Sequence, residues 1–419
     1  MDKLRVGLIG LGTVGSGVYK SLQQFDNVEI VKIAVRNITK PRSVEVPSEI
    51  LTDNPYDIVN DSSVDVVVEL MGGVEPAWDY IRTALENGKH IVTANKELLA
   101  KKGEELFHLS EKHNCVVLYE AAIAGGIPII MPIKTILAGN KIHRIQAILN
   151  GTTNYILTKM DADGASYEEV LKEAQQLGYA EADPTGDVEG FDAAYKITTL
   201  ATIAFNSRIK FENVYREGIT KIRKEDMQRA NELGYKIKLI ASATIDENNN
   251  ADVRVHPMLV SKKNMLAHID YVTNAVAISG HPIGNIVLSG PGAGEFPTAS
   301  SVIGDILAIA REWKTTEYLL PMMRCHHHSV ANPVQIENTY NKYYLSITAP
   351  NAIGVIAKIG TICANKNISL SSILQKGVES DNTAEITVIT EHCLERSIRE
   401  VVAELTECKL NSLIRVLES

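Results

Sequence analysis

The stretch LRVGLIGLGTVGSG, from Leu4 to Gly17, decides how the first third of the chain folds. Its first six residues form a short apolar run, which predicts a buried strand. Glycines follow at positions 10, 12 and 15, and an apolar helical pattern then continues through Val18 and Leu22. The stretch therefore predicts a strand, a tight glycine-rich turn and a helix.

Glycines with GxGxxG spacing between a strand and a helix predict a dinucleotide site. The glycines permit the tight turn and let the backbone approach a pyrophosphate, and the helix N-terminus faces the phosphates. The alternative is a glycine-rich turn that binds nothing. The residues expected to contact a nicotinamide dinucleotide are Gly10, Leu11, Gly12, Thr13, Val14 and Gly15.

The second expected strand, residues 28–35, bears on which dinucleotide is bound. A fold that prefers NAD usually ends this strand with Asp or Glu. Here Val35 is followed by Arg36, with Lys40 and Arg42 nearby. Because a guanidinium suits the 2′-phosphate of NADP, we expect NADP, with NAD as the alternative. Arg36 could otherwise be a solvated loop residue.

Strands and helices alternate through the rest of the N-terminal third. Strands are expected at residues 64–70, 90–93 and 116–120, and helices at 78–87 and 97–113. This rhythm predicts a doubly wound parallel sheet of the Rossmann type. Lys96 and Glu120 follow strands, at the carboxyl edge where such sheets bind ligands. Taken singly, each residue could equally be an ordinary charge at the end of a helix or strand.

A second stretch, GYAEADPTGDVEGFDAAYK at residues 178–196, carries five acids and one lysine. An apolar-periodic helix is expected to begin at Asp187 or Glu189. Asp192 and Lys196 are four residues apart, so they share one helix face, next to positions that suit burial. A half-buried lysine beside a carboxylate can donate a proton. The alternative is an ordinary surface ion pair.

Composition limits the class of protein. A length of 419 residues predicts two or three domains. A net charge of −9 without a basic run argues against nucleic acid. The longest apolar run, residues 121–133, is too short to span a membrane. Five cysteines without a CxxC pair, and no signal-peptide pattern, lead us to expect a cytoplasmic protein.

The middle and the tail of the chain predict two further folds. Helices at 155–160 and 167–177, with alternating strands at 235–245 and 251–260, predict an α+β domain with one open sheet. Residues 343–419 read as βαββαβ, a ferredoxin-like order. Between them lies an unpatterned segment with Cys325 and three adjacent histidines. Metal ligands in series rarely close a tetrahedral site, so we expect a linker there.

Several separated motifs, in order, resemble those of homoserine dehydrogenases over residues 4–313. Besides the nucleotide loop and the acidic stretch, they are TANK at 93–96, YEAAIAGGIP at 119–128, NGTTN at 150–154 and GPGAG at 290–294, with PTASSV after it. The tail is similar to an ACT regulatory domain, with Asn351 where that family usually has an acid. An ordered set of motifs is far more specific than a single motif.

The resemblance implies reversible interconversion of L-aspartate-4-semialdehyde and L-homoserine with a nicotinamide cofactor. By similarity, Lys196 is the proton donor and acceptor at the substrate oxygen. Glu181 and Asp192 hold the substrate, Asp187 supports the polar site, and Lys96 lies near both cofactor and substrate. The further residues placed at the cofactor are Gly178 and Gly294. A sodium-like monovalent cation is placed at Glu120, Ile123, Gly125 and Ile127.

The resemblance also implies regulation and assembly. The ACT-like domain is expected to sense an amino acid, threonine above all, and to pair with another copy in a homodimer or homotetramer. It could instead serve assembly alone. The expected parts are a cofactor domain at 1–135 completed by a helix at 298–313, a substrate domain at 136–297, a linker at 314–342 and the ACT-like domain at 343–419. A domain on such a linker is expected to move relative to the catalytic part.

Two other functions compete with this interpretation. One is another semialdehyde enzyme on the same scaffold, such as aspartate-semialdehyde dehydrogenase, which needs a thiol nucleophile. Cys115 begins an apolar strand and the other four cysteines lie beyond residue 320, so no candidate thiol is evident. The other is a non-catalytic protein that senses NADP and amino acids, and the intact set of Lys196, Glu181 and Asp192 speaks against it.

Overall fold

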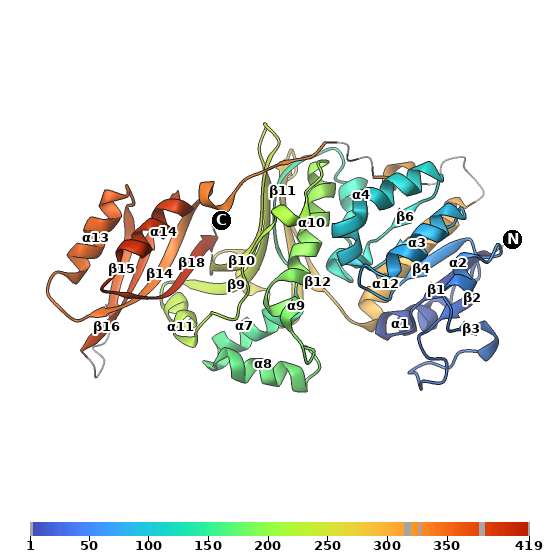
Figure 1. The fold of residues 1–419 in the computed structure, drawn as a ribbon, viewed down its shortest axis with the longest axis horizontal. Coiled ribbons are helices and arrows are strands. Elements are labelled where there is room, and N and C mark those ends of the chain that lie inside the picture. The colour runs from blue at the N-terminus through green and yellow to red at the C-terminus, as the bar shows by residue number, and fades with distance from the viewer. Residues whose placement is uncertain (1–2, 314–319, 326, 328, 377–381, 418–419) are drawn as a thin grey trace. The chain divides into compact units, whose positions relative to one another are not determined.

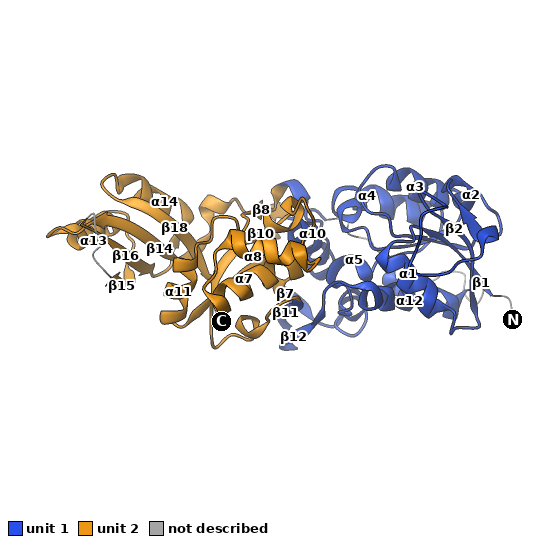
Figure 2. Ribbon diagram, turned by 90° about the horizontal axis from the view of Figure 1, so that it is seen from below, with its two compact units in different colours: residues 1–145, 192–212, 273–331 blue, residues 146–191, 213–272, 332–419 orange. Residues whose placement is uncertain are grey.

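A computed structural model describes the chain except residues 1–2, 314–319, 326, 328, 377–381 and 418–419. Part of the expected linker at 314–342 therefore lies outside the described residues. The chain forms two compact units, each assembled from three separate segments (Figure 2). The first contains residues 1–145, 192–212 and 273–331, and the second contains residues 146–191, 213–272 and 332–419.

The first unit is built on a six-stranded parallel sheet with the order β3-β2-β1-β4-β5-β6. Its strands are β1 (Leu4–Ile9), β2 (Val28–Ala34), β3 (Leu51–Thr52), β4 (Val66–Glu69), β5 (His90–Thr93) and β6 (Val117–Leu118). The central strands are almost fully buried, because a parallel sheet is covered on both faces. This sheet confirms the doubly wound fold expected from the sequence.

Helices flank this sheet (Figure 1). The helices of the unit are α1 (Thr13–Leu22), α2 (Tyr56–Val59), α3 (Ala77–Glu86), α4 (Lys96–Lys112), α5 (Ala121–Ala124), α6 (Ile130–Lys134), α12 (Glu295–Glu312) and, apart from this sheet, all but the first residue of α10 (Phe191–Phe205). A Cβ on Gly17 of α1 would lie 2.7 Å from the carbonyl oxygen of Glu295, so this glycine allows α1 and α12 to approach closely. The unit also holds the hairpin of β11 (Thr273–His281) and β12 (Gly284–Pro291).

The second unit contains the α+β part of the chain. Its helices are α7 (Gly151–Asp163), α8 (Tyr167–Gln176), α9 (Thr185–Val188) and α11 (Lys224–Glu232). Strand β7 (Lys141–Ile148) leads into it, and the long strands β9 (Tyr235–Ile245) and β10 (Asn250–Ser261) pair in antiparallel fashion. The two-residue strands β8 (Tyr215–Arg216) and β13 (Asn332–Pro333) pair with β10 in parallel.

The C-terminal part of the same unit has the expected βαββαβ order. Its elements are β14 (Tyr340–Pro350), α13 (Val355–Asn365), β15 (Leu370–Lys376), β16 (Thr383–Thr390), the short β17 (Cys393–Leu394), α14 (Glu395–Glu404) and β18 (Lys409–Leu417). Its core gathers apolar residues of both helices and the sheet, including Tyr343, Ile359, Ile386 and Ile398.

This C-terminal part is not simply tethered. Strand β18 pairs in parallel with β10, with Met258 opposite Arg415 and Val260 opposite Leu417. The two parts of the second unit therefore share a sheet, whereas the sequence analysis placed a linker between them. Among the described residues, no helix has both the length and the apolar character needed to cross a membrane.

Candidate active site

Helix α10 carries a buried ion pair near its first turn. The Nζ atom of Lys196 lies 2.6 Å from Oδ2 of Asp192, one helical turn earlier. Lys196 is 9 % exposed and Asp192 is 7 % exposed, because apolar neighbours on the helix, such as Ala193 and Ile197, are themselves buried. The alternative of an ordinary surface pair is therefore wrong, since both charges have been taken out of water.

A second lysine reaches the same carboxylate from a distant helix. Lys96 begins α4, and its Nζ atom lies 2.6 Å from Oδ1 of Asp192. The side chain of Asn95 caps this helix by accepting from the N–H of Leu98 at 3.1 Å. Burial would raise the pKa of Asp192, but the two ammonium groups outweigh burial and hold that pKa well below its ordinary value. The carboxylate is thus charged and shared by two lysines.

A buried carboxylate that the sequence analysis did not single out supports this helix start. Glu69, at the end of β4, is completely buried and accepts hydrogen bonds from the backbone of Met71 at 2.8 Å and from Thr93 Oγ1 at 2.7 Å. Thr93 Oγ1 in turn accepts from the N–H of Asn95 at 3.0 Å. Burial raises the pKa of Glu69. The network ties the loop after β4 to the residue before Lys96.

The glycine-rich turn lies where the sequence predicted it, between β1 and α1. Gly10 has φ +103°, and a Cβ on Gly15 would lie 2.2 Å from the carbonyl oxygen of Gly10. Both positions therefore require glycine. A cavity of about 930 Å³ opens beside the turn and is lined by Gly10, Leu11, Gly12, Thr13 and Arg36, among others. Gly15 is buried, and the neighbouring Val14 is half-buried.

Three cations of the loop after β2 also line this cavity, and they differ in what they contact. Arg36 and Lys40 are exposed. The guanidinium of Arg42 donates to the carbonyl oxygens of Ile38 at 3.0 Å and Lys40 at 2.9 Å, so it shapes the loop itself. Glu295, the first residue of α12, also lines the cavity and pairs with Lys20 at 2.7 Å. Gly294 precedes it with φ +120°.

The segment after β6 carries a buried acid that caps the start of a helix. The carboxylate of Glu120, 6 % exposed, accepts from the N–H groups of Ile129, Ile130 and Met131 at 2.5–2.8 Å. These are the free donors at the start of α6. At the expected cation site of Glu120, Ile123, Gly125 and Ile127, the Glu120 side chain is therefore occupied, and the Gly125 carbonyl oxygen accepts from Ser301 Oγ at 2.6 Å. Gly125, with φ +60°, packs directly against Gly292.

The remaining predicted substrate residues belong to the second unit. Asp187, in α9, is half-buried and accepts a hydrogen bond from Asn150 Nδ2 at 2.7 Å. Asn150 also caps α7 through its Oδ1 atom, which accepts from Thr153 at 2.8 Å. Glu181 and Gly178 are exposed, and Gly178 has φ +76°. The expected helix start at Asp187 or Glu189 differs slightly, since α9 ends at Val188 and α10 begins at Phe191.

Cys325 and the adjacent histidines were the candidate metal ligands of the tail. Within the described residues no cluster of three or more His, Cys, Asp or Glu side chains could hold a metal ion. His326 and His328 lie outside those residues. Cys325 instead contacts Tyr119 OH at 2.9 Å and Lys134 Nζ at 2.8 Å. In the C-terminal part, Asn351 lines an open cavity of about 480 Å³ together with Gln375.

Together, a doubly wound domain with a dinucleotide cavity and a buried lysine–carboxylate group define an NAD(P)-dependent oxidoreductase. Comparison with protein families agrees. The family model described as homoserine dehydrogenase matches residues 128–307, its NAD binding domain matches residues 10–120, and the ACT domain matches residues 343–409. The chain belongs to the homoserine dehydrogenase family.

Individual relatives extend over nearly the whole chain. The homoserine dehydrogenase of Synechocystis sp. is 41 % identical and covers 99 % of this chain and 99 % of its own length. That of Bacillus subtilis is 38 % identical over 98 % of this chain and 96 % of its own. The crystal structure of a homoserine dehydrogenase from Thiobacillus denitrificans has a TM-score of 0.93 at 38 % identity, covering 100 % of this chain and 99 % of that one. A hyperthermophilic archaeal homoserine dehydrogenase in complex with NADPH has a TM-score of 0.64 at 27 % identity, covering 76 % and 99 %.

Proposed function

We propose that this chain catalyses the reversible reduction of L-aspartate-4-semialdehyde to L-homoserine with NADP, with Lys196 as the proton donor and acceptor. This reaction belongs to the pathway that leads to threonine, methionine and isoleucine. The observation that carries the proposal is the buried carboxylate of Asp192, which two lysines share at 2.6 Å each. The carboxylate of Asp192 holds the Lys196 ammonium in place with little exposure to solvent. In such an environment an ammonium stabilises the negative charge that develops on a substrate most strongly.

The roles of the residues follow from the chemistry. The bound nicotinamide would supply or accept the hydride. When the aldehyde carbon is reduced, its oxygen becomes an alkoxide, and the Lys196 ammonium stabilises this charge and gives the proton. Asp192 orients Lys196 through their 2.6 Å contact. Lys96 adds a second positive charge on the same carboxylate, and the Glu69 network fixes where its helix begins.

Other residues would bind rather than react. Glu181 and Asp187 are the acids proposed to hold the substrate's ammonium group. Gly178 and Gly294, both with positive φ, are proposed to lie against the cofactor without a side chain in the way. The pyrophosphate is proposed to lie against the glycine turn, because this turn lines the cavity and Gly12 faces open space there.

One assay tests the activity and separates it from its competitors. Purified protein should oxidise L-homoserine with NADP, followed by absorbance of the reduced nicotinamide. An enzyme that instead phosphorylates and oxidises aspartate semialdehyde would need phosphate and a reactive thiol. Burial raises the pKa of the Cys115 thiol to about 11, which disfavours its thiolate. Binding of NADP without turnover would support the sensing function and overturn the proposal.

We infer a preference for NADP over NAD from Arg36. It is exposed at the rim of the cavity, and no acid ends β2. Its guanidinium can therefore pair with a 2′-phosphate. Comparing the Michaelis constants for NADP and NAD tests this preference directly.

A monovalent cation such as sodium is proposed at the carbonyl oxygens of Glu120, Ile123, Gly125 and Ile127. The surroundings of this loop favour a polar guest. Within the described residues, both amide atoms of the buried Asn274 lack a hydrogen-bond partner, and Asn274 packs on Gly292, which covers Gly125. Thermal unfolding of the protein free of cofactor in sodium, potassium and tetramethylammonium chloride tests the site. Equal stability in all three salts would contradict it.

We propose that the C-terminal ACT-like domain, residues 343–419, binds an amino acid, with threonine as the first candidate, and that it pairs with a second copy in a homodimer or homotetramer. Its loop around Asn351 borders a cavity, and the neighbouring Ile353 is fully exposed. Titrating the full chain with threonine while following rate and heat tests the effector. Light scattering tests the assembly. Five unpaired cysteines fit a reducing compartment, from which we infer a cytoplasmic location.

A further inference from the structure

The strip of chain from Tyr215 to Thr220 lies between the C-terminal domain and the segment that carries Asp187. It begins as β8, which pairs with β10 so that Tyr215 lies opposite Arg254. The N–H of Glu217 donates to Val255 O at 2.8 Å, so the extended pairing continues beyond β8. In an extended strip, successive side chains point to opposite sides. Tyr215 and Glu217 therefore share one side, and Arg216 and Gly218 share the other.

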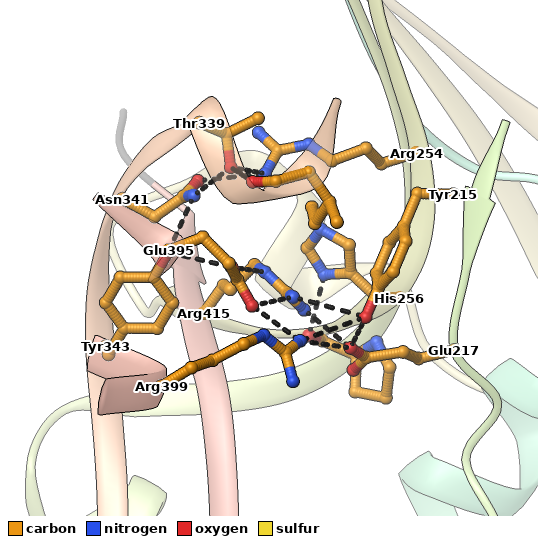
Figure 3. Close-up of polar contacts among 12 residues, drawn as sticks. Tyr215, Glu217, Arg254, His256, Thr339, Asn341, Tyr343, Glu395, Arg399 and Arg415 are labelled. Carbon is orange, nitrogen blue, oxygen red and sulfur yellow. Dashed lines mark hydrogen bonds and ion pairs between the residues drawn. The ribbon is translucent and has the colours of Figure 1, made fainter. Parts of the chain in front are cut away.

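The first side contacts the C-terminal domain through a charge cluster with a buried centre (Figure 3). Arg415 of β18 is 2 % exposed and donates from two nitrogens to the fully buried Glu395, at 2.7 and 2.8 Å. Its third nitrogen donates to Glu217 at 3.1 Å. Tyr215 OH also donates to Glu217, and Arg399 donates to Tyr215 OH at 3.3 Å. The strip is thus held by a guanidinium that the C-terminal domain fixes in place.

The second side contacts residues 188–191. We call these residues, together with Asp187, the substrate segment. The guanidinium of Arg216 lies 3.5 Å from the ring centroid of Phe191. A Cβ on Gly218 would lie 2.4 Å from the carbonyl oxygen of Val188, so this backbone is in direct contact with the strip.

Two hydrogen bonds complete this contact. Ile219 N–H donates to Val188 O at 2.8 Å, and Thr220 Oγ1 donates to Glu189 at 3.0 Å. The strip therefore contacts the substrate segment through backbone, ring and side-chain groups. Phe191 is followed in the chain by Asp192, so the segment also leads directly into the buried ion pair.

We infer that Glu217 and Arg415 are positioning residues for the substrate segment. Arg415 holds the carboxylate of Glu217 in position, and Glu217 in turn holds the strip. The opposite side of the strip then fixes the position of the backbone at residues 187–191. The C-terminal domain thereby acts on substrate binding in the absence of any effector. The inference rests on the proposed role of Asp187 in holding the substrate.

Steady-state kinetics of homoserine oxidation by the full chain test the inference. Glu217→Ala should raise the Michaelis constant for homoserine about tenfold, within the range that couplings between distant sites produce. The Michaelis constant for NADP should stay within about twofold, because the glycine turn belongs to the other unit. Glu217→Gln keeps an acceptor for Arg415 and should recover part of the loss. Adding Arg415→Met to Glu217→Ala should add little to the rise in the Michaelis constant, because both variants break the contact between the two residues. The double variant should be less stable, because Arg415→Met also removes two hydrogen bonds to the buried Glu395.

Glu385→Ala is the matched control. Glu385 of β16 pairs with Arg223 and Arg229 at 3.2 Å each, so it forms another partly buried ion pair of this unit. Its partners among the residues that the structure describes lie outside the strip. Its removal should lower stability and leave the Michaelis constant for homoserine unchanged. An equal rise in this control would show a general loss of stability and overturn the inference.

A further variant separates this inference from the proposed function. If Asp187→Asn raises the Michaelis constant for homoserine while Glu217→Ala does not, the positioning role is wrong and the substrate role stands. If Asp187→Asn has no effect either, the substrate role of this segment is itself wrong, and the positioning role falls with it.

Discussion

Replacing Lys196 with methionine removes the proposed proton donor while keeping most of the side-chain volume. In this variant Asp192 is not left alone, because Lys96 still contacts its other oxygen at 2.6 Å. The fold should therefore survive the substitution. Asp192→Asn is the opposite case, since it leaves two ammonium groups facing a neutral amide.

The expected losses of turnover and of stability can both be given a size. Loss of a general acid usually costs about 10²–10⁴ in turnover, or roughly 3–5 kcal/mol of transition-state stabilisation. Removing one partner of a buried ion pair lowers the free energy of unfolding by about 3–5 kcal/mol. Asp192→Asn should reach this range, because the side chains of Asp192 and Lys196 are only 8 % and 11 % exposed. Lys196→Met should cost less, because one ammonium still compensates the carboxylate.

Three measurements check this reasoning. Initial rates of homoserine oxidation give the turnover number, fluorescence titration gives the dissociation constant of NADPH, and urea unfolding gives the stability of each variant. Lys196→Met should lose turnover and bind NADPH as before. Near-normal turnover would remove Lys196 from the mechanism. A Lys196→Met protein less stable than Asp192→Asn would refute the view that both lysines share the charge of Asp192.

Three further outcomes are expected. Arg36→Ala should raise the Michaelis constant for NADP about tenfold to a hundredfold, from a charge-assisted contact of roughly 1.5–3 kcal/mol, and leave that for NAD nearly unchanged; equal effects on both would show that Arg36 does not contact the 2′-phosphate. Gly15→Ala should abolish nucleotide binding measured by fluorescence, because its Cβ would lie 2.2 Å from Gly10 O; unaltered affinity would contradict this. Burial lowers the pKa of His90 from 6.5 to about 4, so the unfolded chain takes up a proton first as the pH falls. His90 alone should therefore lower the free energy of unfolding below pH 6.5 by up to about 3 kcal/mol, and His90→Asn should show a correspondingly smaller drop, because the buried His256, whose pKa burial also lowers, still contributes.

The sequence predicted the elements with local signals best. The strands at His90–Thr93 and Tyr235–Ile245 have the predicted bounds, because their apolar patterns are clear. The hairpin at Thr273–Pro291 was not predicted. Gly290 near its end was interpreted as a motif position, although the apolar run at residues 275–278 does indicate a strand.

The candidate site shows the limit of spacing arguments. The four-residue interval predicted the contact of Asp192 with Lys196, but burial of the pair depends on tertiary packing that no local pattern records. Lys96 was assigned by resemblance, and its contact with Asp192 joins positions almost a hundred residues apart. Glu69 was missed because a single acid at the end of a strand has no periodic signal, and only the fold brings Thr93 and Met71 to it.

The way the chain passes repeatedly between its two units has a consequence for its synthesis. Unit 1 needs α12, which follows most of unit 2, and unit 2 needs β18, which pairs with β10 across a long intervening segment. Neither unit can therefore finish folding while its last segment is still inside the ribosome. Pairings between distant segments form slowly and leave strand edges exposed meanwhile. The edge of β10 that β18 later covers should therefore be exposed on the nascent chain and bind chaperones. This binding should increase with the time that passes before β18 emerges.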